Sequence, residues 1–135
     1  MTEKRFPEWI FPEIKDGQPT KYNWIVQNSE GLRLGYNTDI GAFSYINALN
    51  GVVIEKNVQI GSHCSIYSIS TIDKTSGEVL LKENCKIGTH TTILPGITIG
   101  KNSIIGANSL VNKSIPDNVI AFGSPAKIIK KINDE

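Results

Sequence analysis

The sequence has few aromatic residues, almost no excess of charge and no long apolar run. Aromatic residues make up 7% of its 135 residues, and the formal net charge is +1. A near-neutral chain has no broad attraction for nucleic acid or a membrane surface, so neither partner is expected. Because no signal peptide or membrane-spanning segment is visible, we expect a cytoplasmic protein, and the length suits one domain.

The main feature that the sequence does have is a repeat of six residues. It is clearest in KENCKIGTHTTILPGITIGKNSIIGANSLVNKS, where Ile87-Gly88, Ile93-Leu94 and Ile99-Gly100 each open a block. Strands alternate every two residues and helices every 3.6, so a period of six fits neither a hairpin nor a helix. It predicts an all-β solenoid with one short strand per block and three blocks per coil.

The period predicts about four coils over residues 34–116. The expected stacks of inward residues are Leu34–Ile54–Leu81–Ile99, Ile40–Ile60–Ile87–Ile105 and Ile46–Ile66–Ile93–Val111. Two extra residues within Ala48–Val53 should bulge one corner, and residues 72–80, IDKTSGEVL, should form a loop because they carry a turn signal. Such insertions lie on one face of a solenoid, often the binding face.

Both ends of the chain lie outside the repeat. Residues 1–33 are rich in aromatic residues and proline, and we expect them to cover the apolar end of the first coil. The alternative is that part of this segment reaches a neighbouring subunit or the acceptor pocket. Residues 117–135 should form a turn and a short amphipathic helix over Ala126–Asn133 that follows Pro125. Tyr22–Gln27 has the composition of a short strand.

The two cysteines, Cys64 and Cys85, occupy the inward fifth place of IGSHCS and LKENCK. They fall in different columns of the solenoid. We interpret them as buried, reduced packing residues, with a reactive or disulfide role as the alternative.

Three motifs, ILPGITIG, IGANSLV and FGSPAKII, resemble the C-terminal half of the hexapeptide-repeat acyltransferases. The closest group contains the maltose and galactoside acetyltransferases and relatives that acetylate sugars of surface polysaccharides. The resemblance covers Leu34–Ile132 and implies a left-handed parallel β-helix that takes acetyl-CoA as co-substrate in a groove between subunits. A homotrimer follows from the resemblance, and flat solenoid faces are good mutual partners.

The resemblance also implies a catalytic base, which this chain lacks at the expected place. Relatives carry a histidine after a run like tyrosine–x–x–x–histidine, and IYSISTID has Thr71 there. The assisting aspartate would fall near Asn47, and it is missing too. His63 and His90, both in the fourth place of a block, are the other candidates, because imidazole titrates near neutrality. They should stack one coil apart, either as an active-site row or as a solvated ladder.

The donor side follows the family pattern more closely. Thr89 in KIGT and Ala107 in IGAN match positions whose backbone groups hold the pantetheine arm. Lys113, Lys127 and Lys130 match cationic positions near the nucleotide phosphates, the alternative being an ordinary solvated cationic segment.

Asn108 follows His90 in the same column, and we count it with Asn47 and Thr71 as a candidate for binding the acceptor. Two histidines in one column are too few for the three-histidine metal site of γ-class carbonic anhydrases, so no metal is expected.

Taken together, the resemblance implies an acetyltransferase acting on a sugar or nucleotide-linked amino sugar in surface-polysaccharide synthesis. The acceptor would attack the thioester directly. The alternative is a non-catalytic β-helix that binds a sugar nucleotide or scaffolds partners, which the missing aspartate and histidine favour.

Overall fold

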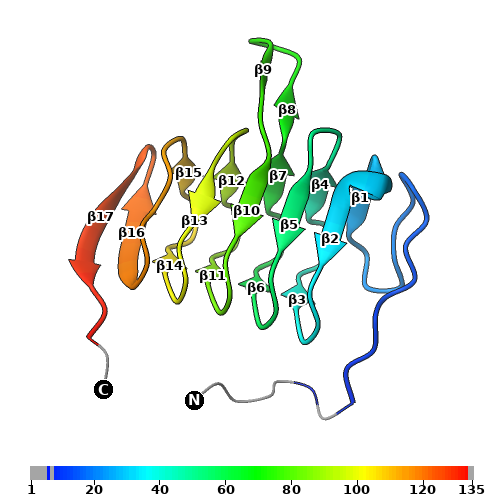
Figure 1. Cartoon of the computed structure of the whole chain (residues 1–135), viewed down its shortest axis with the longest axis horizontal. Helices are drawn as coiled ribbons and strands as arrows, with labels where there is room; N and C mark the ends of the chain where they lie inside the picture. Colours follow the sequence, from blue (N-terminus) through cyan, green and yellow to red (C-terminus); the bar gives the residue numbers. More distant parts are fainter. Residues whose placement is uncertain (1–5, 7, 134–135) are drawn as a thin grey trace.

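The computed structural model describes residues 6 and 8–133, and shows a three-sided prism of short strands stacked in coils (Figure 1). The predicted all-β parallel β-helix of hexapeptide repeats is confirmed. Residues 1–5 and 7 of the expected cap, and 134–135 of the expected C-terminal segment, lie outside the described residues. In the part of the chain that the structure describes, no helix is long and apolar enough to cross a membrane.

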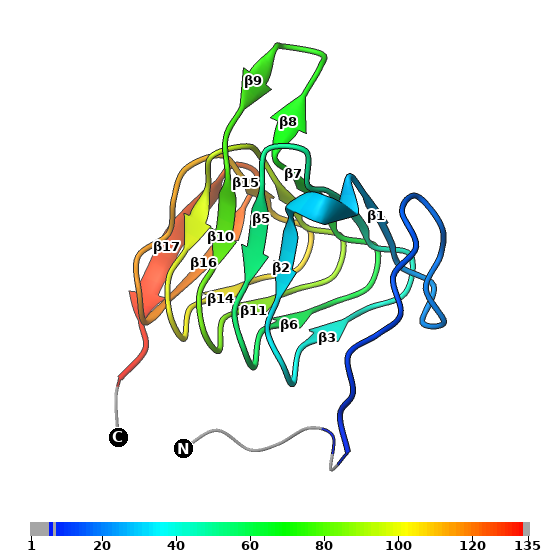
Figure 2. The ribbon, with the colours of Figure 1, turned by 45° about the vertical axis from the view of Figure 1, so that its right-hand side comes forward.

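Each coil crosses three faces in the same order, so strands one coil apart pair in parallel (Figure 2). The first face contains β1 (Ile25–Gln27), β4 (Tyr45–Asn47), β7 (Ser65–Tyr67), β12 (Thr92–Ile93) and β15 (Leu110–Val111). The second face contains β2 (Leu32–Leu34), β5 (Val52–Ile54), β10 (Val79–Leu81) and β13 (Thr98–Ile99). The third face contains β3 (Asp39–Ile40), β6 (Gln59–Ile60), β11 (Lys86–Ile87), β14 (Ile104–Ile105), β16 (Val119–Gly123) and β17 (Ala126–Lys131).

The three predicted stacks of inward residues occur in the predicted register. The pairs include Leu81 with Ile54 and Ile99, Ile87 with Ile60 and Ile105, and Ile93 with Ile66 and Val111. Each such side chain, fully buried, stabilises the fold by about 1.5–3 kcal/mol. The winding begins at Ile25, ahead of Leu34, because Val26 pairs with Ile46 and is fully buried although no glycine follows it.

The corner between the second and third faces turns on an asparagine in every coil, and we call it the asparagine corner. Its turning residues, all with positive φ, are Asn37, Asn57, Asn84, Asn102 and Asn118. Asparagine tolerates this left-handed conformation better than most residues. The Asn84 amide donates to Asn102 over 2.7 Å, and the Asn102 amide donates to Asn118 over 3.0 Å. The ladder therefore pairs side chains that the turn itself requires, although Oδ1 of Asn37 is buried without a partner among the described residues.

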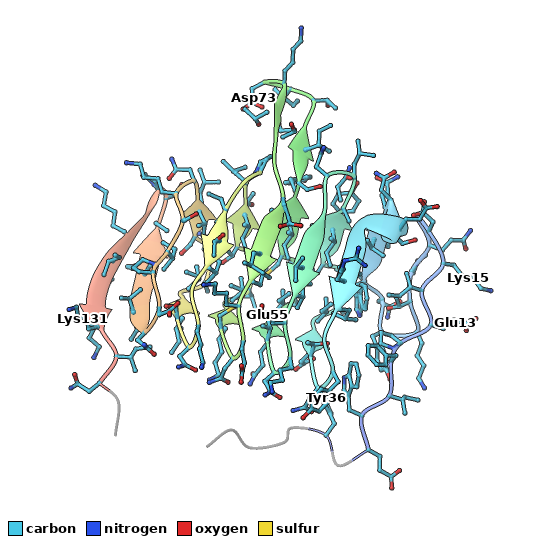
Figure 3. All side chains as sticks on the ribbon, in the orientation of Figure 1. Glu13, Lys15, Tyr36, Glu55, Asp73 and Lys131 are labelled. Carbon is cyan, nitrogen blue, oxygen red and sulfur yellow. The ribbon has the colours of Figure 1, made fainter. Side chains whose placement is uncertain are left out.

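The corner between the first and second faces carries the extra residues, and we call it the insertion corner. The short 3-10 helix η1 (Ser29–Gly31) lies there, and the hairpin β8 (Ile69–Ser70) and β9 (Thr75–Ser76) projects from it (Figure 1). Asp73, at the end of the hairpin in Figure 3, accepts hydrogen bonds from Thr75, which lower the pKa of its carboxyl. Val79, inside the expected loop, already belongs to β10 because it pairs with Val52 and is buried.

The N-terminal segment lies across the first coil. Trp24 is 2% exposed in the core, and Ile14 packs against the core from outside. The Trp9 indole N–H donates to the Thr38 carbonyl oxygen over 2.8 Å. These contacts cover the apolar end of the coil, while Ile10 remains 70% exposed.

The predicted C-terminal helix is wrong. Residues Ala126–Lys131 form β17, which turns back at Pro125 and pairs antiparallel with β16. The hydrophobic spacing in AKIIKKIN resembles a helix, but the open edge of the third face offers backbone partners that an isolated short helix would lack. The change places Lys127 opposite Phe122 and Lys130 opposite Ile120.

Candidate functional site

The corner between the third and first faces carries both histidines, and we call it the histidine corner. Its turning residues, all with positive φ, are Asn23, Phe43, His63, His90 and Asn108. The predicted column of fourth-place residues is therefore present, with Asn23 as an additional first member. From Phe43 onward, each turn is held by a backbone bond to the coil before it, such as His90 N–H to the Ser62 carbonyl over 3.1 Å.

The two imidazoles form the centre of this column. Their rings lie parallel, with an angle of 2° between the planes and 4.7 Å between the centroids. The Phe43 ring lies 5.2 Å from the His63 ring and is tilted by 41° against it, and Phe43 is 64% exposed. Nδ1 of His63 lies 3.2 Å from the Ser62 hydroxyl oxygen. Both imidazoles are exposed, so an acceptor hydroxyl or amine can approach them from solvent, as general base catalysis requires.

The third-place residues beside this column differ from their neighbours in their backbone hydrogen bonds. In the described part of the chain, the N–H groups of Thr89 and Ala107 donate to no protein acceptor, although the Thr89 carbonyl accepts from Asn108 over 2.8 Å. Both residues are exposed. Unpaired backbone donors need water or a ligand as partner. Two such donors in adjacent coils suit an extended ligand with spaced carbonyl groups.

The lysines separate into two places. Lys127 and Lys130 lie on β17, at the last rung of the third face. Lys127 is opposite Phe122, near the histidine corner, whereas Lys130 is opposite Ile120, toward the asparagine corner. Lys113 follows β15 and lies at the insertion corner. All three side chains are exposed, so each is available to an anion, but Lys113 is not beside the other two in one subunit.

The candidate acceptor residues also separate. Asn108 is in the histidine corner, whereas Thr71 lies in the projecting hairpin and Asn47 ends β4. The side-chain Oδ1 of Asn47 accepts from the Asn28 side-chain amide over 3.0 Å and from the Leu49 N–H over 3.2 Å, so this side chain also holds the corner itself.

The first face lies between these two groups. His63, His90 and Thr89 precede its strands, while Thr71 and Lys113 follow them. One subunit therefore cannot bring the groups together, but two copies can if the histidine corner of one faces the insertion corner of the next. A single site that uses all of these residues would therefore need two copies of the chain.

Sequence reasoning missed Phe122. In the column Gly41, Gly61, Gly88 and Gly106, the second place of every third-face block is glycine, and the next member is Phe122. The signal was available, because IAFGSP keeps the aliphatic first place and replaces the glycine with the largest apolar ring. The side chain lies against Gly106 and is 53% exposed at the histidine corner.

Both cysteines are buried and free. Burial raises the pKa of the Cys64 thiol, which lies 3.2 Å from the Gly88 carbonyl oxygen. Burial, aided by the Glu55 carboxylate, raises the pKa of Cys85 to about 12. Neither thiol is suited to act as a nucleophile, since the thiolate is the reactive form. Among the described residues, no group of three or more histidine, cysteine or acidic side chains is placed to hold a metal ion.

Comparison with known proteins gives a consistent result. Residues 78–113 match the family model described as bacterial transferase hexapeptide, six repeats. The galactoside O-acetyltransferase of Lactococcus lactis subsp. lactis is 37% identical over 115 residues, a match that covers 74% of this chain and 56% of that protein. The chain therefore spans little more than half the length of this relative.

Two solved structures share the coils. A galactoside acetyltransferase in complex with coenzyme A matches with a TM-score of 0.75 and 30% identity, covering 82% of this chain and 60% of that one. A maltose O-acetyltransferase from Clostridium difficile 630 matches with a TM-score of 0.59 and 31% identity, covering 84% of this chain and 68% of that one.

Proposed function

The chain belongs to the hexapeptide-repeat transferase family, and on this premise we propose that it is an acetyl-CoA-dependent acetyltransferase whose acceptor is a sugar. One observation carries the proposal. At the histidine corner, the free backbone donors of Thr89 and Ala107 are aligned with two exposed, stacked imidazoles. A donor arm bound along these amides would deliver its thioester to the histidines.

The positions of the lysines indicate in which direction acetyl-CoA would lie along the histidine corner. Lys127 and Lys130 lie on the last rung, beyond Ala107 along the prism axis. Phosphate groups bound there would send the pantetheine arm back past Ala107 and Thr89 toward His90 and His63. Lysine is a suitable point charge for phosphate. The related structure bound to coenzyme A supports this choice of donor.

The reaction would be a direct transfer. The acceptor oxygen or nitrogen attacks the thioester carbonyl carbon, the new C–O or C–N bond forms, and the C–S bond breaks to release the coenzyme A thiolate. The acceptor proton passes to an imidazole, for which we rank His63 ahead of His90 because it shares a coil with the Ile66–Thr71 segment. The imidazolium then transfers this proton to the coenzyme A thiolate.

The acceptor class follows from the relatives and from one departure. The related enzymes are named for galactosides and maltose, which supports a sugar. Thr71 stands where the family resemblance implies a histidine, and an amine needs less help from a base than a hydroxyl. We therefore propose an amino sugar, free or nucleotide-linked, as the preferred acceptor. A setting in surface-polysaccharide synthesis rests on the family resemblance alone.

The working unit would be a homotrimer. The two groups of candidate residues lie at opposite edges of the first face, so a site that uses both would form only where two subunits meet. Closed rotational symmetry gives every subunit both halves of a site. In this arrangement Lys113 and Thr71 of one subunit face His63 and Thr89 of the next.

A non-catalytic role is the second candidate, and Thr71 in place of the family histidine favours it. Such a protein would bind a sugar nucleotide or coenzyme A without transfer. It predicts thermal stabilisation by the ligand and no release of thiol.

The test is a screen of sugars, amino sugars and nucleotide sugars with acetyl-CoA, in which free thiol release and acetylated product are measured. The proposal predicts turnover with at least one acceptor and faster turnover with amines than with matched hydroxyls. Stabilisation by coenzyme A with no turnover across the panel would favour the non-catalytic role. A protein that coenzyme A does not stabilise would contradict both.

A further inference from the structure

Phe122 interrupts a column that is otherwise glycine for a steric reason. A Cβ at Gly41 would lie 2.4 Å from the backbone nitrogen of Ser62, and one at Gly88 would lie 2.5 Å from that of Ala107. Both distances are far below contact, so the coil that follows forbids a side chain at this place. After Phe122 the chain turns back into β17, and within residues 8–133 no further coil covers the corner. The last rung is therefore the one place in the column where a large ring is admissible.

The ring does not serve the core. Its Cδ1 and Cγ lie 3.2 and 3.4 Å from where a Cβ of Gly106 would be, so the ring folds back along the corner onto the glycine of the preceding coil. The residue nevertheless remains 53% exposed. An apolar ring that lies on backbone and is open to solvent can stack with a planar ligand.

The surroundings of the ring indicate what kind of planar ligand would stack on it. Phe122 pairs with Lys127 in the antiparallel β16–β17 ladder, and opposed residues of such a pair have side chains on the same face of the sheet. The ring is also one coil beyond the free N–H of Ala107 and two beyond that of Thr89. A flat ring, a cation and a line of amide donors thus follow one another along one corner.

We propose that Phe122 is the platform on which the adenine base of acetyl-CoA stacks, with Lys127 beside it as a phosphate ligand. The inference rests on the proposed function and adds a residue that determines donor specificity. Stacking of a base on an aromatic side chain is tolerant of sequence and strong enough to matter, so the platform would favour full coenzyme A thioesters over short acetyl thioesters.

The experiment measures binding, so that it does not depend on knowing the acceptor. Wild type, Phe122→Ala and Phe122→Trp are titrated with coenzyme A, with adenosine 3′,5′-bisphosphate and with pantetheine. Phe122→Ala is expected to weaken coenzyme A and the bisphosphate by about 5- to 150-fold and to leave pantetheine unchanged. Phe122→Trp should retain wild-type affinity, since it preserves the aromatic face.

Tyr36→Ala is the matched control, because Tyr36 is 49% exposed but lies at the asparagine corner. It should bind all three probes like wild type. Thermal unfolding of each variant near the wild-type temperature establishes that the fold is intact.

The possible results distinguish a failure of the adenine platform from a failure of the proposed function. If wild type binds coenzyme A and Phe122→Ala binds it within about twofold, the platform is wrong and the proposed function stands. Equal weakening of pantetheine would also overturn the platform, since it would show a general disturbance of the corner. If wild type does not bind coenzyme A at all, the proposed function fails, and the platform fails with it.

Discussion

His63 and His90 stack with their ring planes 2° apart because their backbones are the same. Both have φ of 58°, both occupy the fourth place of a block, and each N–H donates to the third-place carbonyl one coil earlier. The solenoid thus brings the two imidazoles together without any attraction specific to histidine. Their chemical role has to be tested by changing the rings while the turn is kept.

Replacement of each histidine by asparagine meets that condition. Asparagine tolerates the left-handed turn, and Asn108 already fills the same place one coil on with φ of 61°. We expect His63→Asn to lower kcat by about 10²–10⁴, with little change in the KM for acetyl-CoA, and His90→Asn to have the smaller effect. Steady-state kinetics across the range in which imidazole titrates measure both.

The rival account is that the site only orients the acceptor, whose proton passes to water. It predicts that both variants keep rates within about threefold of wild type and the same dependence on pH. That result would make the histidine stack a feature of the architecture alone.

The buried Cys85 thiol predicts a loss of stability at alkaline pH. Its pKa is raised to about 12, whereas an unfolded cysteine titrates near about pH 8.5. The folded state keeps a proton that the unfolded chain releases, so this contribution is complete below about pH 8.5 and is lost as pH rises toward 12. The free energy of unfolding should fall by up to about 1.4 kcal/mol per pH unit from this group.

Cys85→Val is the matched variant, because Val58 fills the equivalent buried place one coil earlier and Val119 fills it two coils later. It should lie within about 1.5 kcal/mol of wild type at neutral pH. Urea unfolding at several alkaline pH values gives the free energy of unfolding of wild type and of the variant. The contributions of other titrating groups cancel in the difference between these two free energies. A difference that does not change with pH would show that the thiol ionises as readily when folded.

Cys64→Ser should be milder than Cys85→Ser, because a hydroxyl at position 64 would have a carbonyl acceptor within reach. The Gly88 carbonyl oxygen lies 3.2 Å from the Cys64 sulfur, and the hydroxyls of Ser44 and Ser109 already bond to carbonyls in the same column. We expect a cost below about 1 kcal/mol at position 64 and about 1–3 kcal/mol at 85. Equal losses in urea unfolding would contradict this reading.

The glycine column predicts a gradient of tolerance. Gly88→Ala would place a Cβ 2.5 Å from the backbone of Ala107, which cannot move without breaking the coil. At Gly106 the nearest atom is the Phe122 Cβ at 2.9 Å, on the terminal strand pair. We expect Gly88→Ala to cost about 1–3 kcal/mol or more in urea unfolding and Gly106→Ala clearly less. Equal costs would mean that the last rung is as rigid as the interior.

The period of six predicted the coils well because it is set by geometry that every coil repeats. An aliphatic residue at each first place and a glycine at the second correspond to the buried stacks and to the close approach of coils, so even the residue-to-residue register followed. The start at Ile25 was missed because Val26 joins its column without the glycine signal. The last rung was missed because AKIIKKIN has a spacing that also suits a helix, and its pairing with β16 is a tertiary effect.

The candidate site was less predictable for the same reason. Sequence spacing gives the column of a residue, and so it foresaw that His63 and His90 would stack. It does not show which corner faces which in an assembly, and it grouped Lys113 with Lys127 although they lie at different corners. The role of Phe122 was not predicted because it depends on where the coils end.

Mixing of subunits tests whether the site is shared. One variant, His63→Asn with His90→Asn, would disable the histidine corner, and another, Thr71→Arg, would block the insertion corner with a bulky charge on an exposed hairpin. Each should be inactive alone. If the histidine corner of one subunit faces the insertion corner of the next around a threefold axis, every mixed trimer contains one interface in which both halves are intact. Unfolding and refolding the two variants together at equal amounts should therefore restore about a quarter of wild-type activity.

The control is each variant refolded alone, and sedimentation equilibrium establishes that trimers have formed. Trimers that remain inactive after mixing would show that both groups of residues act within one subunit, or that one of them does not act at all.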